Sequence, residues 1–424
     1  MAKVLEDVIT EDIITDYIAH QVRHPYAPDE IMALVKAFEK GENVGLCGPP
    51  GVGKTLMVYT AAKLMGREIE SITCVPDTTV TDIVGGYVPK IKEGALGFEL
   101  ELKKGPLARA MEEGKIFYAD EYNKLERSIQ SYLSAPLDFR KELRAKDGTL
   151  LVREAHKNFA FVASWNPGEE YGGEEIIGYI KDRISYMPFS TLPIDLQTRI
   201  VLLKSGNLNI EDIKDDKIQE RAIANIDGKF VCMIRMGDYF VDIHNKKRKL
   251  KADDKRLRRY LCYVGKEGDK LELKDKKKQE TYENFYNLAS FVRDCRNIIL
   301  YGSKGIREEL KNVLSAFNLG DLEPLHEIYH IEPRSIRVIE PLAKKYKELL
   351  ENIEEGGLSP EEMVEELAED LIYNLIQDKE NVEISPNITW GQLVRKIGEL
   401  YHMKIKDETY QLIKEKGFAE MPEE

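Results

Sequence analysis

The sequence predicts an α/β fold in which a parallel sheet of five strands is followed by a helical region. Three observations predict it. An apolar run at 43–47 leads into a glycine-rich loop and then a helix. Further apolar runs alternate with helical segments, which is the pattern of strands joined by crossover helices. One of these runs ends in two adjacent acids, Asp120 and Glu121, at the strand end where open α/β sheets hold their ligands.

Composition describes a globular protein. The 424 residues are 42% hydrophobic and 32% charged, which is enough for two or three domains. No apolar run approaches the ~20 residues of a membrane span, and the start lacks the apolar stretch of a signal peptide. The five cysteines lie far apart without a C-x-x-C pair, as expected for reduced thiols. We therefore expect a cytoplasmic protein with no membrane span.

The glycine-rich loop fits the phosphate-binding pattern G-x-x-x-x-G-K-[ST]. It consists of Gly48, Pro49, Pro50, Gly51, Val52, Gly53, Lys54 and Thr55. The three glycines let the backbone turn tightly and point its N–H groups at an anion. Lys54 can reach the β- and γ-phosphates of a nucleotide, and the Thr55 hydroxyl can bind Mg²⁺. A helix predicted over 54–65 adds its dipole to this nucleotide–Mg²⁺ site.

Between the loop and the two acids, the sequence predicts a strand, a hairpin and a helix. Residues 68–74 alternate polar and apolar side chains, as strands do, and 81–87 are typical of a short capped helical turn. Residues 88–104 are predicted to form an inserted hairpin, because two short runs of β-forming residues flank a loop that contains glycine. A helix with proline near its first turn follows at 105–113.

The strand predicted at 115–121 ends in the two acids. ATP hydrolysis needs one carboxylate to hold the Mg²⁺ that bridges the phosphates and a second to orient the attacking water. We assign Asp120 to the metal and Glu121 to the water. An ordinary strand-end turn could also hold two acids. The phosphate loop, whose Lys54 precedes Asp120 by 66 residues, favours the catalytic interpretation.

Two further strand ends carry polar residues. The strand predicted at 158–164 is followed by Asn166, whose amide could place the water beside the γ-phosphate; the alternative is a turn residue before proline. A fifth strand is predicted at 184–189. Arg183, just before it, could be an arginine finger that reaches a neighbouring subunit's phosphate, and the alternative is a surface salt bridge.

With these motifs in place, the chain resembles a MoxR-type AAA+ ATPase, within the clade that carries a hairpin inserted into its second helix. The resemblance runs from about residue 20 to about residue 205 and resumes near 285–346. The matching motifs are Gly48–Thr55, Thr81–Gly85, Gly105–Ala110, Ala119–Lys124, Ala163–Pro167 and Asp182–Ile184. The resemblance implies an AAA+ P-loop core with a helical lid, ATP and Mg²⁺ as cofactors, and a homo-oligomeric ring, usually a hexamer.

The resemblance also implies roles for single residues. Asn166 is sensor 1, Arg183 is the finger acting in trans, and Arg334 is the sensor 2 arginine that reaches the γ-phosphate in cis. The hairpin at 88–104 would face the pore or the upper surface of the ring. One departure stands beside sensor 1, because Trp165 occupies a position where the family often has a smaller or polar residue.

A second departure is a basic segment that interrupts the lid. The chain has a net charge of −13, yet residues 227–280 carry 17 Lys and Arg against 10 Asp and Glu, and residues 347–424 carry 8 against 20. A hairpin is predicted at 229–243, and nine Lys and Arg lie within 244–259. This run fits a patch for nucleic acid or an acidic partner. It also fits a solvated Lys-rich loop, or a surface that opposes the acidic C-terminal part within the ring.

The sequence therefore predicts four segments. They are an AAA+ α/β nucleotide-binding core over 1–205, a basic insert with a hairpin over 206–280, a helical lid over 281–350 and a C-terminal helical segment over 351–424. The C-terminal helices follow from capping patterns at Ser359–Glu362 and Thr389–Gln392.

The function predicted is Mg²⁺-dependent ATP hydrolysis by a ring that remodels or matures a protein partner. The resemblance implies a partner that bears a von Willebrand factor A domain. The alternative is a nucleic-acid-dependent AAA+ motor in replication, restriction or packaging that uses the basic insert. A third interpretation, an assembly factor that binds ATP but turns over little, is disfavoured because Asp120 and Glu121 are both present.

Overall fold

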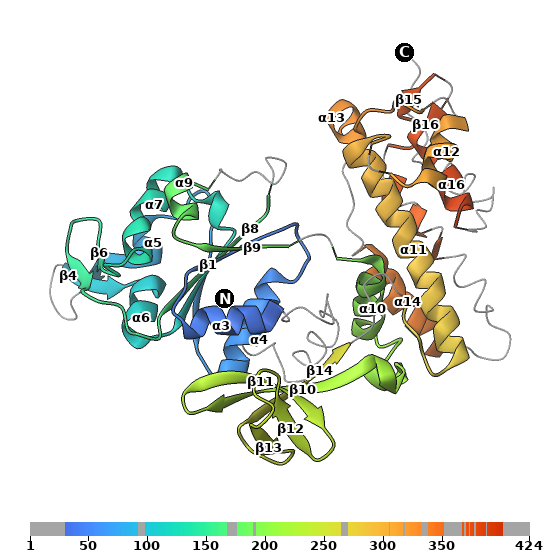
Figure 1. Ribbon diagram of the computed structural model, residues 1–424. Helices are drawn as coiled ribbons and strands as arrows, with labels where there is room; N and C mark the ends of the chain where they lie inside the picture. Colours follow the sequence, from blue (N-terminus) through green and yellow to red (C-terminus); the bar gives the residue numbers. More distant parts are fainter. Residues whose placement is uncertain are drawn as a thin grey trace. The chain divides into compact units, whose positions relative to one another are not determined.

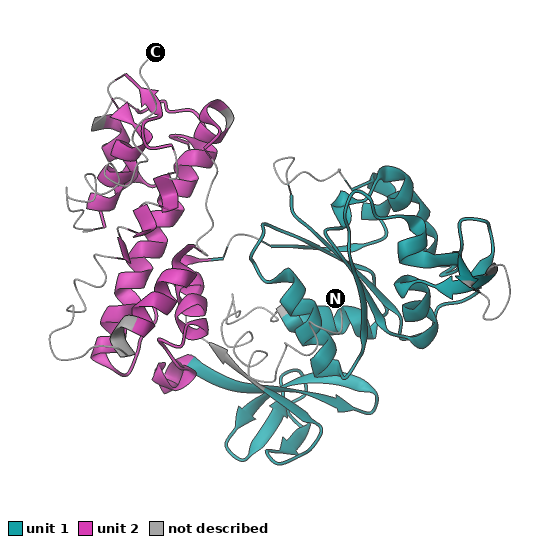
Figure 2. Ribbon diagram, turned by 180° about the vertical axis from the view of Figure 1, so that it is seen from behind, with its two compact units in different colours: residues 1–192, 218–266 teal, residues 193–217, 267–424 magenta. Residues whose placement is uncertain are grey.

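The computed structural model describes residues 30–91, 98–167, 176–189, 192–263, 270–304, 306–316, 319–331, 338–351, 367–368, 370–372, 374–376, 379–386 and 388–401. The chain forms two compact units (Figure 2). Unit 1 comprises residues 1–192 and 218–266, and unit 2 comprises residues 193–217 and 267–424. The domain boundaries predicted after residues 205, 280 and 350 stay predictions.

A parallel sheet of five strands lies at the centre of the nucleotide-binding part of unit 1 (Figure 1). Its strands are β1 (Val44–Cys47), β2 (Ile69–Thr73), β5 (Ile116–Asp120), β8 (Ala160–Trp165) and β9 (Ser185–Pro188). Their order is β2-β5-β8-β1-β9, and all four neighbouring pairs are parallel. The five-stranded α/β core predicted from the sequence is therefore confirmed.

Helices cover both faces of this sheet (Figure 1). On one face lie α3 (Glu30–Glu39) and α4 (Lys54–Met65), and on the other lie α5 (Val80–Val84), α6 (Pro106–Glu113) and α7 (Arg127–Tyr132). Side chains alternate along a strand, so Phe117 and Ala119 of β5 pack into the core beside α5 and α6. Tyr118 and Asp120 therefore face the start of α4, where both contact Thr55.

Glycines shape the loop that precedes α4. Gly51 and Gly53 have φ angles of 84° and 88°, a left-handed conformation that other residues rarely adopt. A Cβ on Gly48 would lie 2.5 Å from the Cβ of Phe189, so this position has no room for a side chain. The helix covers the predicted residues 54–65, and Gly66 follows it as a left-handed C-cap.

The predicted hairpin is confirmed between α5 and α6. It consists of β3 (Gly85–Ile91) and β4 (Phe98–Lys104), which pair antiparallel. The register places Tyr87 opposite Leu102 and Pro89 opposite Leu100, so these four side chains share one face. The remaining short elements of this part are η1 (Tyr122–Lys124), α8 (Ser134–Leu137), β6 (Leu143–Arg144), β7 (Leu150–Val152) and α9 (Gly178–Lys181).

The basic insert is a second, antiparallel sheet in unit 1 (Figure 1). Its strands are β10 (Ile218–Ile226), β11 (Lys229–Met236), β12 (Tyr239–Asp242), β13 (Lys249–Lys251) and β14 (Leu257–Tyr263), in the order β13-β12-β11-β10-β14. The β11–β12 hairpin was predicted, whereas β10, β13 and β14 were not. Met233, Phe240 and Leu250 are buried in the small core of this sheet.

Unit 2 contains the helices of the segments predicted as lid and C-terminal region (Figure 2). Its longer helices are α10 (Ile194–Lys204), α11 (Lys276–Tyr301), α12 (Glu308–Ala316), α14 (Ile339–Glu351) and α16 (Trp390–Glu399). It also contains η3 (Ile210–Asp212), η4 (Asp215–Lys217), α13 (Leu325–Tyr329), β15 (Glu383–Ser385) and β16 (Ile388–Thr389). The predicted cap before α16 is confirmed, because Thr389 and Gln392 form a capping box. The other predicted cap, Ser359–Glu362, lies outside the described residues.

Of the helices that the structure describes, none combines the length and the apolar composition that crossing a bilayer requires.

Candidate nucleotide site

Lys54 is held at the edge of the parallel sheet by three oxygen atoms. Its Nζ donates to the carbonyl oxygens of Gly48 and Pro49 over 2.7 and 3.0 Å, and to Oδ1 of Asn166 over 2.8 Å. An ammonium group has three protons, so each of them has an acceptor. Burial lowers the pKa of Lys54, and the carboxylates of Glu121 and Asp120 oppose this effect. The cation therefore lies between the loop and two carboxylates.

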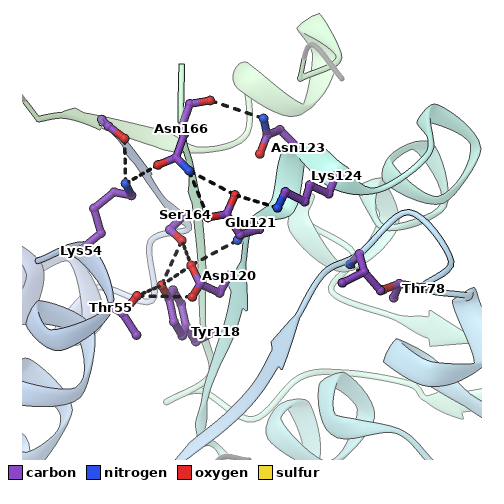
Figure 3. Close-up of polar contacts among 12 residues, drawn as sticks. Lys54, Thr55, Thr78, Tyr118, Asp120, Glu121, Asn123, Lys124, Ser164 and Asn166 are labelled. Carbon is purple, nitrogen blue, oxygen red and sulfur yellow. Dashed lines mark hydrogen bonds and ion pairs between the residues drawn. The ribbon is translucent and has the colours of Figure 1, made fainter. Parts of the chain in front are cut away.

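Asn166 links this lysine to Glu121. Its Nδ2 donates to both carboxylate oxygens of Glu121, over 3.0 and 3.2 Å, while its Oδ1 accepts from Lys54. Figure 3 shows Lys54, Asn166 and Glu121 in one line of contacts. Lys124 lies 3.9 Å from Oε2 of the same carboxylate. Asn123 donates to the backbone carbonyl of Asn166 over 3.4 Å.

Glu121 itself has an unusual backbone. Its φ of 54° and ψ of 41° are left-handed, which costs a non-glycine residue on the order of 1 kcal/mol or more. This conformation turns the chain sharply between β5 and η1, so that Asp120 and Glu121 point in different directions. Asp120 faces α4, and Glu121 faces Asn166. The strand end thus separates two carboxylates that are adjacent in sequence.

Asp120 is surrounded by hydroxyl groups. Tyr118 donates to its Oδ1 over 2.9 Å, Ser164 donates to the same oxygen, and Oγ1 of Thr55 lies 3.3 Å from Oδ2. Figure 3 shows these three hydroxyls converging on the carboxylate. Hydroxyl and carboxylate oxygens are ligands that Mg²⁺ prefers. The Thr55–Asp120 pair therefore fits a magnesium ion, with Tyr118 and Ser164 behind it.

Trp165 lies in the core and leaves the site geometry intact. It is 7% exposed, and its ring packs 6.0 Å from that of Tyr186. The neighbouring strand makes room for the indole, because a Cβ on Gly45 would lie 2.6 Å from its Cη2. The large side chain of Trp165, which departs from the family pattern, is thus accommodated because Gly45 of β1 has no side chain. Asn166, the next residue, still lies in the site.

Arg183 and Arg334, which are expected to stabilise charge, and Arg199 on α10 are in different situations. Arg183 is half-buried, and its Nη1 donates to the carbonyl oxygen of Tyr179 over 2.6 Å. Within the described residues, its side chain makes no hydrogen bond or ion pair with Lys54, Asp120 or Glu121. Arg199 is buried in α10 and paired with Asp195 over 3.0 Å, so it is not presented to a nucleotide. Arg334 lies outside the described residues.

The resemblance also places the start of the sensor 2 helix at residues 330–335, of which the structure describes His330 and Ile331. His330 has a left-handed φ of 53° and follows α13 as its C-cap, so a helix ends there rather than begins. The next described helix, α14, begins at Ile339. The residues between 332 and 337 lie outside the described part of the chain.

Sequence reasoning brought Lys54, Thr55, Asp120, Glu121 and Asn166 to one site, and the structure places all five in contact. It missed Tyr118 and Ser164. Tyr118 precedes Asp120 by two positions on β5, and residues two apart share a strand face. Ser164 lies on β8, two positions before Asn166, which follows the end of that strand. That spacing was the available signal.

The geometry can be set beside known proteins. Residues 43–184 match the family described as AAA domain (dynein-related subfamily). Protein NorQ of Paracoccus denitrificans (strain Pd 1222) is 32% identical over 178 residues, which are 42% of this chain and 63% of NorQ. Residues 43–184 are a MoxR-type AAA+ ATPase domain. Protein CbbQ of Hydrogenophilus thermoluteolus is also similar to the AAA+ domain, at 29% identity over 196 residues, or 46% of this chain and 71% of CbbQ.

The similarity is confined to part of each chain. Uncharacterized protein YojN of Bacillus subtilis (strain 168) is 28% identical over 199 residues, which are 46% of this chain and 62% of YojN. The chain therefore spans less than two thirds of NorQ and of YojN. The AAA+ domain carries the phosphate loop, the two acids, Asn166 and Arg183, whereas the basic insert and unit 2 lie beyond residue 184.

Proposed function

We propose that this chain hydrolyses ATP with Mg²⁺ in a homo-oligomeric ring, a hexamer by analogy with the family, and uses the energy to remodel a protein partner. The observation that carries the proposal is the contact of Asn166 with both Lys54 and Glu121. It puts a phosphate-binding cation and a carboxylate base on opposite sides of one amide. A γ-phosphate and a water molecule are the two groups that such a pair can hold.

Each residue of the site has its own role in the proposed hydrolysis of ATP. Lys54 binds the β- and γ-phosphates. To do so, its ammonium group gives up its hydrogen bonds to the carbonyl oxygens of Gly48 and Pro49. Thr55 and Asp120 hold Mg²⁺, which when bound neutralises charge on the phosphate oxygens. Glu121 accepts a hydrogen bond from the attacking water and draws its proton away as the oxygen approaches phosphorus. Asn166 keeps the carboxylate turned toward the phosphate end of Lys54.

Arg183 completes a neighbouring site in this proposal. Its side chain contacts Tyr179 of its own subunit and none of the five residues gathered at its own site. A cation placed in this way is available to a nucleotide bound by another copy of the chain. In an AAA+ ring each subunit would supply Arg183 to the next, so that hydrolysis depends on assembly.

Mixing two inactive variants tests the ring and the finger together. Lys54→Ala subunits retain Arg183, and Arg183→Ala subunits retain Lys54. In an equal mixture, about a quarter of the sites should combine an intact Lys54 with an intact neighbouring Arg183 and regain turnover. Lys54→Ala mixed with the Lys54→Ala/Arg183→Ala double variant is the matched control and should stay inactive. Mixed rings that form but show no turnover would contradict the trans role.

The hairpin between α5 and α6 supports a protein partner. Tyr87, Leu100 and Leu102 share one of its faces and are 47%, 61% and 36% exposed. The opposite face carries charge, including the pair of Lys90 with Glu101 over 3.2 Å. An exposed apolar face suits contact with another protein better than contact with phosphate backbones. A partner that bears a von Willebrand factor A domain is our specific proposal.

A binding experiment separates the two faces of the hairpin. Glu121→Gln is expected to hold ATP and keep the partner bound. In that background, Leu100→Ser/Leu102→Ser should reduce capture of a purified von Willebrand factor A domain protein from the same organism by about tenfold. Glu101→Ser, on the charged face, should not. Equal capture by both variants would place the partner elsewhere on the chain.

The basic insert favours nucleic acid as a second candidate partner. Lys249 and Lys251 flank the buried Leu250 on β13, opposite Val241 and Tyr239 of β12. Both lysines are exposed, and within the described residues neither has an ion-pair partner. Tyr239, on the same face, is 45% exposed. Cations spaced along a strand beside an aromatic ring are a pattern of single-strand binding surfaces.

The salt dependence of oligonucleotide binding distinguishes a nucleic-acid-binding surface on the basic insert from a solvated Lys-rich loop. A single-stranded oligonucleotide should bind wild-type protein more weakly at about 200 mM than at about 50 mM salt, and Lys249→Glu/Lys251→Glu should abolish binding. Lys276→Glu/Lys277→Glu, in the exposed first turn of α11, is the matched control. Equal loss in both pairs would indicate non-specific attraction only.

We also infer a cytoplasmic location. Cys47, Cys74 and Cys295 are buried thiols, which supports a reducing compartment.

A further inference from the structure

Tyr118 lies at the point where the phosphate-loop helix meets two strands. Its hydroxyl lies 3.1 Å from Oγ1 of Thr55, 2.9 Å from Oδ1 of Asp120 and 2.9 Å from Oγ of Ser164. Figure 3 shows the ring rising from β5 between Thr55 and Asp120. The residue is 1% exposed, so these three side chains replace water as its partners. A phenylalanine would fill the same volume without making any of these contacts.

Counting protons fixes the direction of the hydrogen bonds. A phenol has one proton to donate and lone pairs to accept. The Asp120 carboxylate only accepts, and Ser164 donates its own proton to Asp120. The Tyr118 proton has two acceptors at 2.9 Å, Oδ1 of Asp120 and Oγ of Ser164, and the charged carboxylate is the stronger one. With either acceptor, the phenol oxygen is left to accept the proton of Thr55 over 3.1 Å. The competing acceptor for Thr55, Oδ2 of Asp120, is farther away at 3.3 Å.

This direction matters for a metal ligand. A threonine hydroxyl binds a cation through an oxygen lone pair, so its proton must point elsewhere. If the proton pointed at Oδ2 of Asp120, it would occupy the carboxylate oxygen that the metal also needs. If the Tyr118 oxygen accepts the Thr55 proton instead, the lone pairs of Thr55 and Oδ2 of Asp120 are both available to the metal. Groups behind the ligands of a metal commonly set affinity in this way.

We propose that Tyr118 is a positioning residue for the magnesium site, which accepts the Thr55 proton and donates to Asp120 so that both ligands present lone pairs to the metal. The inference rests on the proposed function, since it concerns the same Mg²⁺–nucleotide site. It assigns to Tyr118 no contact with nucleotide or metal.

The surroundings hold Tyr118 in this position. Its ring packs edge-on against that of Tyr59, with centroids 6.2 Å apart, and the Tyr59 hydroxyl donates to Ser71 over 3.0 Å. Tyr59 also provides a matched control, because it is a buried tyrosine of α4 whose hydroxyl bonds away from the site.

The test measures how Mg²⁺ changes nucleotide binding, without requiring hydrolysis. A fluorescent ATP analogue is titrated in EDTA and at rising Mg²⁺ concentrations with wild-type protein, Tyr118→Phe and Tyr59→Phe. Tyr118→Phe should bind the analogue in EDTA as wild type does, and should need about 10-fold more Mg²⁺ to reach half of the Mg²⁺-dependent gain. Tyr59→Phe should match wild type in both measurements. Binding in EDTA also reports that the variant is folded.

A second variant separates the two hydrogen bonds of Tyr118. Ser164→Ala removes the other donor to Asp120 but leaves the Thr55 proton with its acceptor, so its Mg²⁺ midpoint should shift less than that of Tyr118→Phe. An unchanged midpoint in Tyr118→Phe, or an equal shift in Tyr59→Phe, would overturn the inference while leaving the proposed function intact. A wild-type protein whose nucleotide binding ignores Mg²⁺ would contradict both.

Discussion

The side-chain amide of Asn166 donates to both carboxylate oxygens of Glu121, over 3.0 and 3.2 Å. Both hydrogen bonds come from the single nitrogen Nδ2, so they hold the two carboxylate oxygens toward the amide. The same side chain accepts from Lys54 over 2.8 Å. Asn166 therefore couples the orientation of the proposed base to the group that binds phosphate, and several outcomes can be expected from this coupling.

Asn166→Ala should lower turnover more than nucleotide affinity. Without the amide, Glu121 loses both hydrogen bonds from Asn166 and Lys54 loses one of three acceptors, but the loop and the Mg²⁺ ligands remain. Turnover should fall by about 100-fold, as when a single positioned donor is removed from an active site. Steady-state hydrolysis with a separate ATP-binding measurement checks this. Asn158→Ala, exposed before β8, is the control and should match wild type.

Lys54→Met should weaken ATP binding itself. A hydrogen bond from a charged donor contributes about 1.5–3 kcal/mol, so affinity should fall by about 10- to 100-fold. Equilibrium binding of a fluorescent ATP analogue gives the number. Lys63→Met removes an exposed lysine from the same helix and should bind as wild type does. Equal affinity for the two variants would mean that the loop binds nucleotide without this cation.

Gly45→Ala should destabilise the parallel sheet. Its Cβ would lie 2.6 Å from Cη2 of Trp165 and 2.7 Å from Cγ2 of Ile184, so strands must shift. Overpacking of this kind costs about 1–3 kcal/mol in the free energy of unfolding. Denaturant unfolding measures the loss. Gly178→Ala is the control, since nothing lies within 4 Å of its added Cβ.

A double variant shows whether the indole is the cause. If Trp165 is the obstacle, Trp165→Leu should relieve part of the Gly45→Ala penalty, and the two changes should be less destabilising together than the sum of their separate effects. Strictly additive free energies of unfolding would rule out this packing explanation.

The Cys74 thiol should make stability fall at alkaline pH. Burial, with the negative charges of Asp120 and Glu121, raises the pKa of this thiol to about 12, whereas an unfolded cysteine ionises near about 8.5. Between these values the unfolded chain releases a proton that the folded chain keeps. The contribution is therefore fully present below about pH 8.5 and is lost as pH rises toward 12.

Comparing wild type with Cys74→Ala isolates this contribution from other groups that titrate in the same range. The difference between their free energies of unfolding should shrink as pH rises from about 8.5 to about 11. A difference that is constant across this range would show that the folded thiol ionises as freely as the unfolded one.

The nucleotide site was predictable because its signals are local. Glycines at fixed spacing determine the loop before Lys54, and an apolar run determines the strand that ends at Asp120. The roles of Tyr118 and Ser164 were missed because each is an ordinary member of an apolar strand until β5, β8 and α4 come together. Their hydroxyls acquire a shared acceptor in Asp120 only in the folded sheet.

The basic insert was predicted only in part for the same physical reason. The β11–β12 hairpin has a two-residue turn at Gly237 and Asp238 between alternating runs, which is a local signal. By contrast, β13 contains the three residues 249–251, and its strand character comes from pairing with β12. The pairing of β10 with β14 joins Ile218 to Tyr263, which lie 45 residues apart in the sequence, and no local pattern predicts a pairing over that separation.

Turnover by Glu121→Gln tests the central claim most directly. The substitution keeps the size of the side chain but removes the carboxylate that is proposed to draw a proton from water. The account predicts that ATP still binds with an affinity within about tenfold of wild type, while the rate of phosphate release in Mg²⁺ falls by about 100-fold or more. A variant that binds ATP and releases phosphate at the wild-type rate would contradict the account.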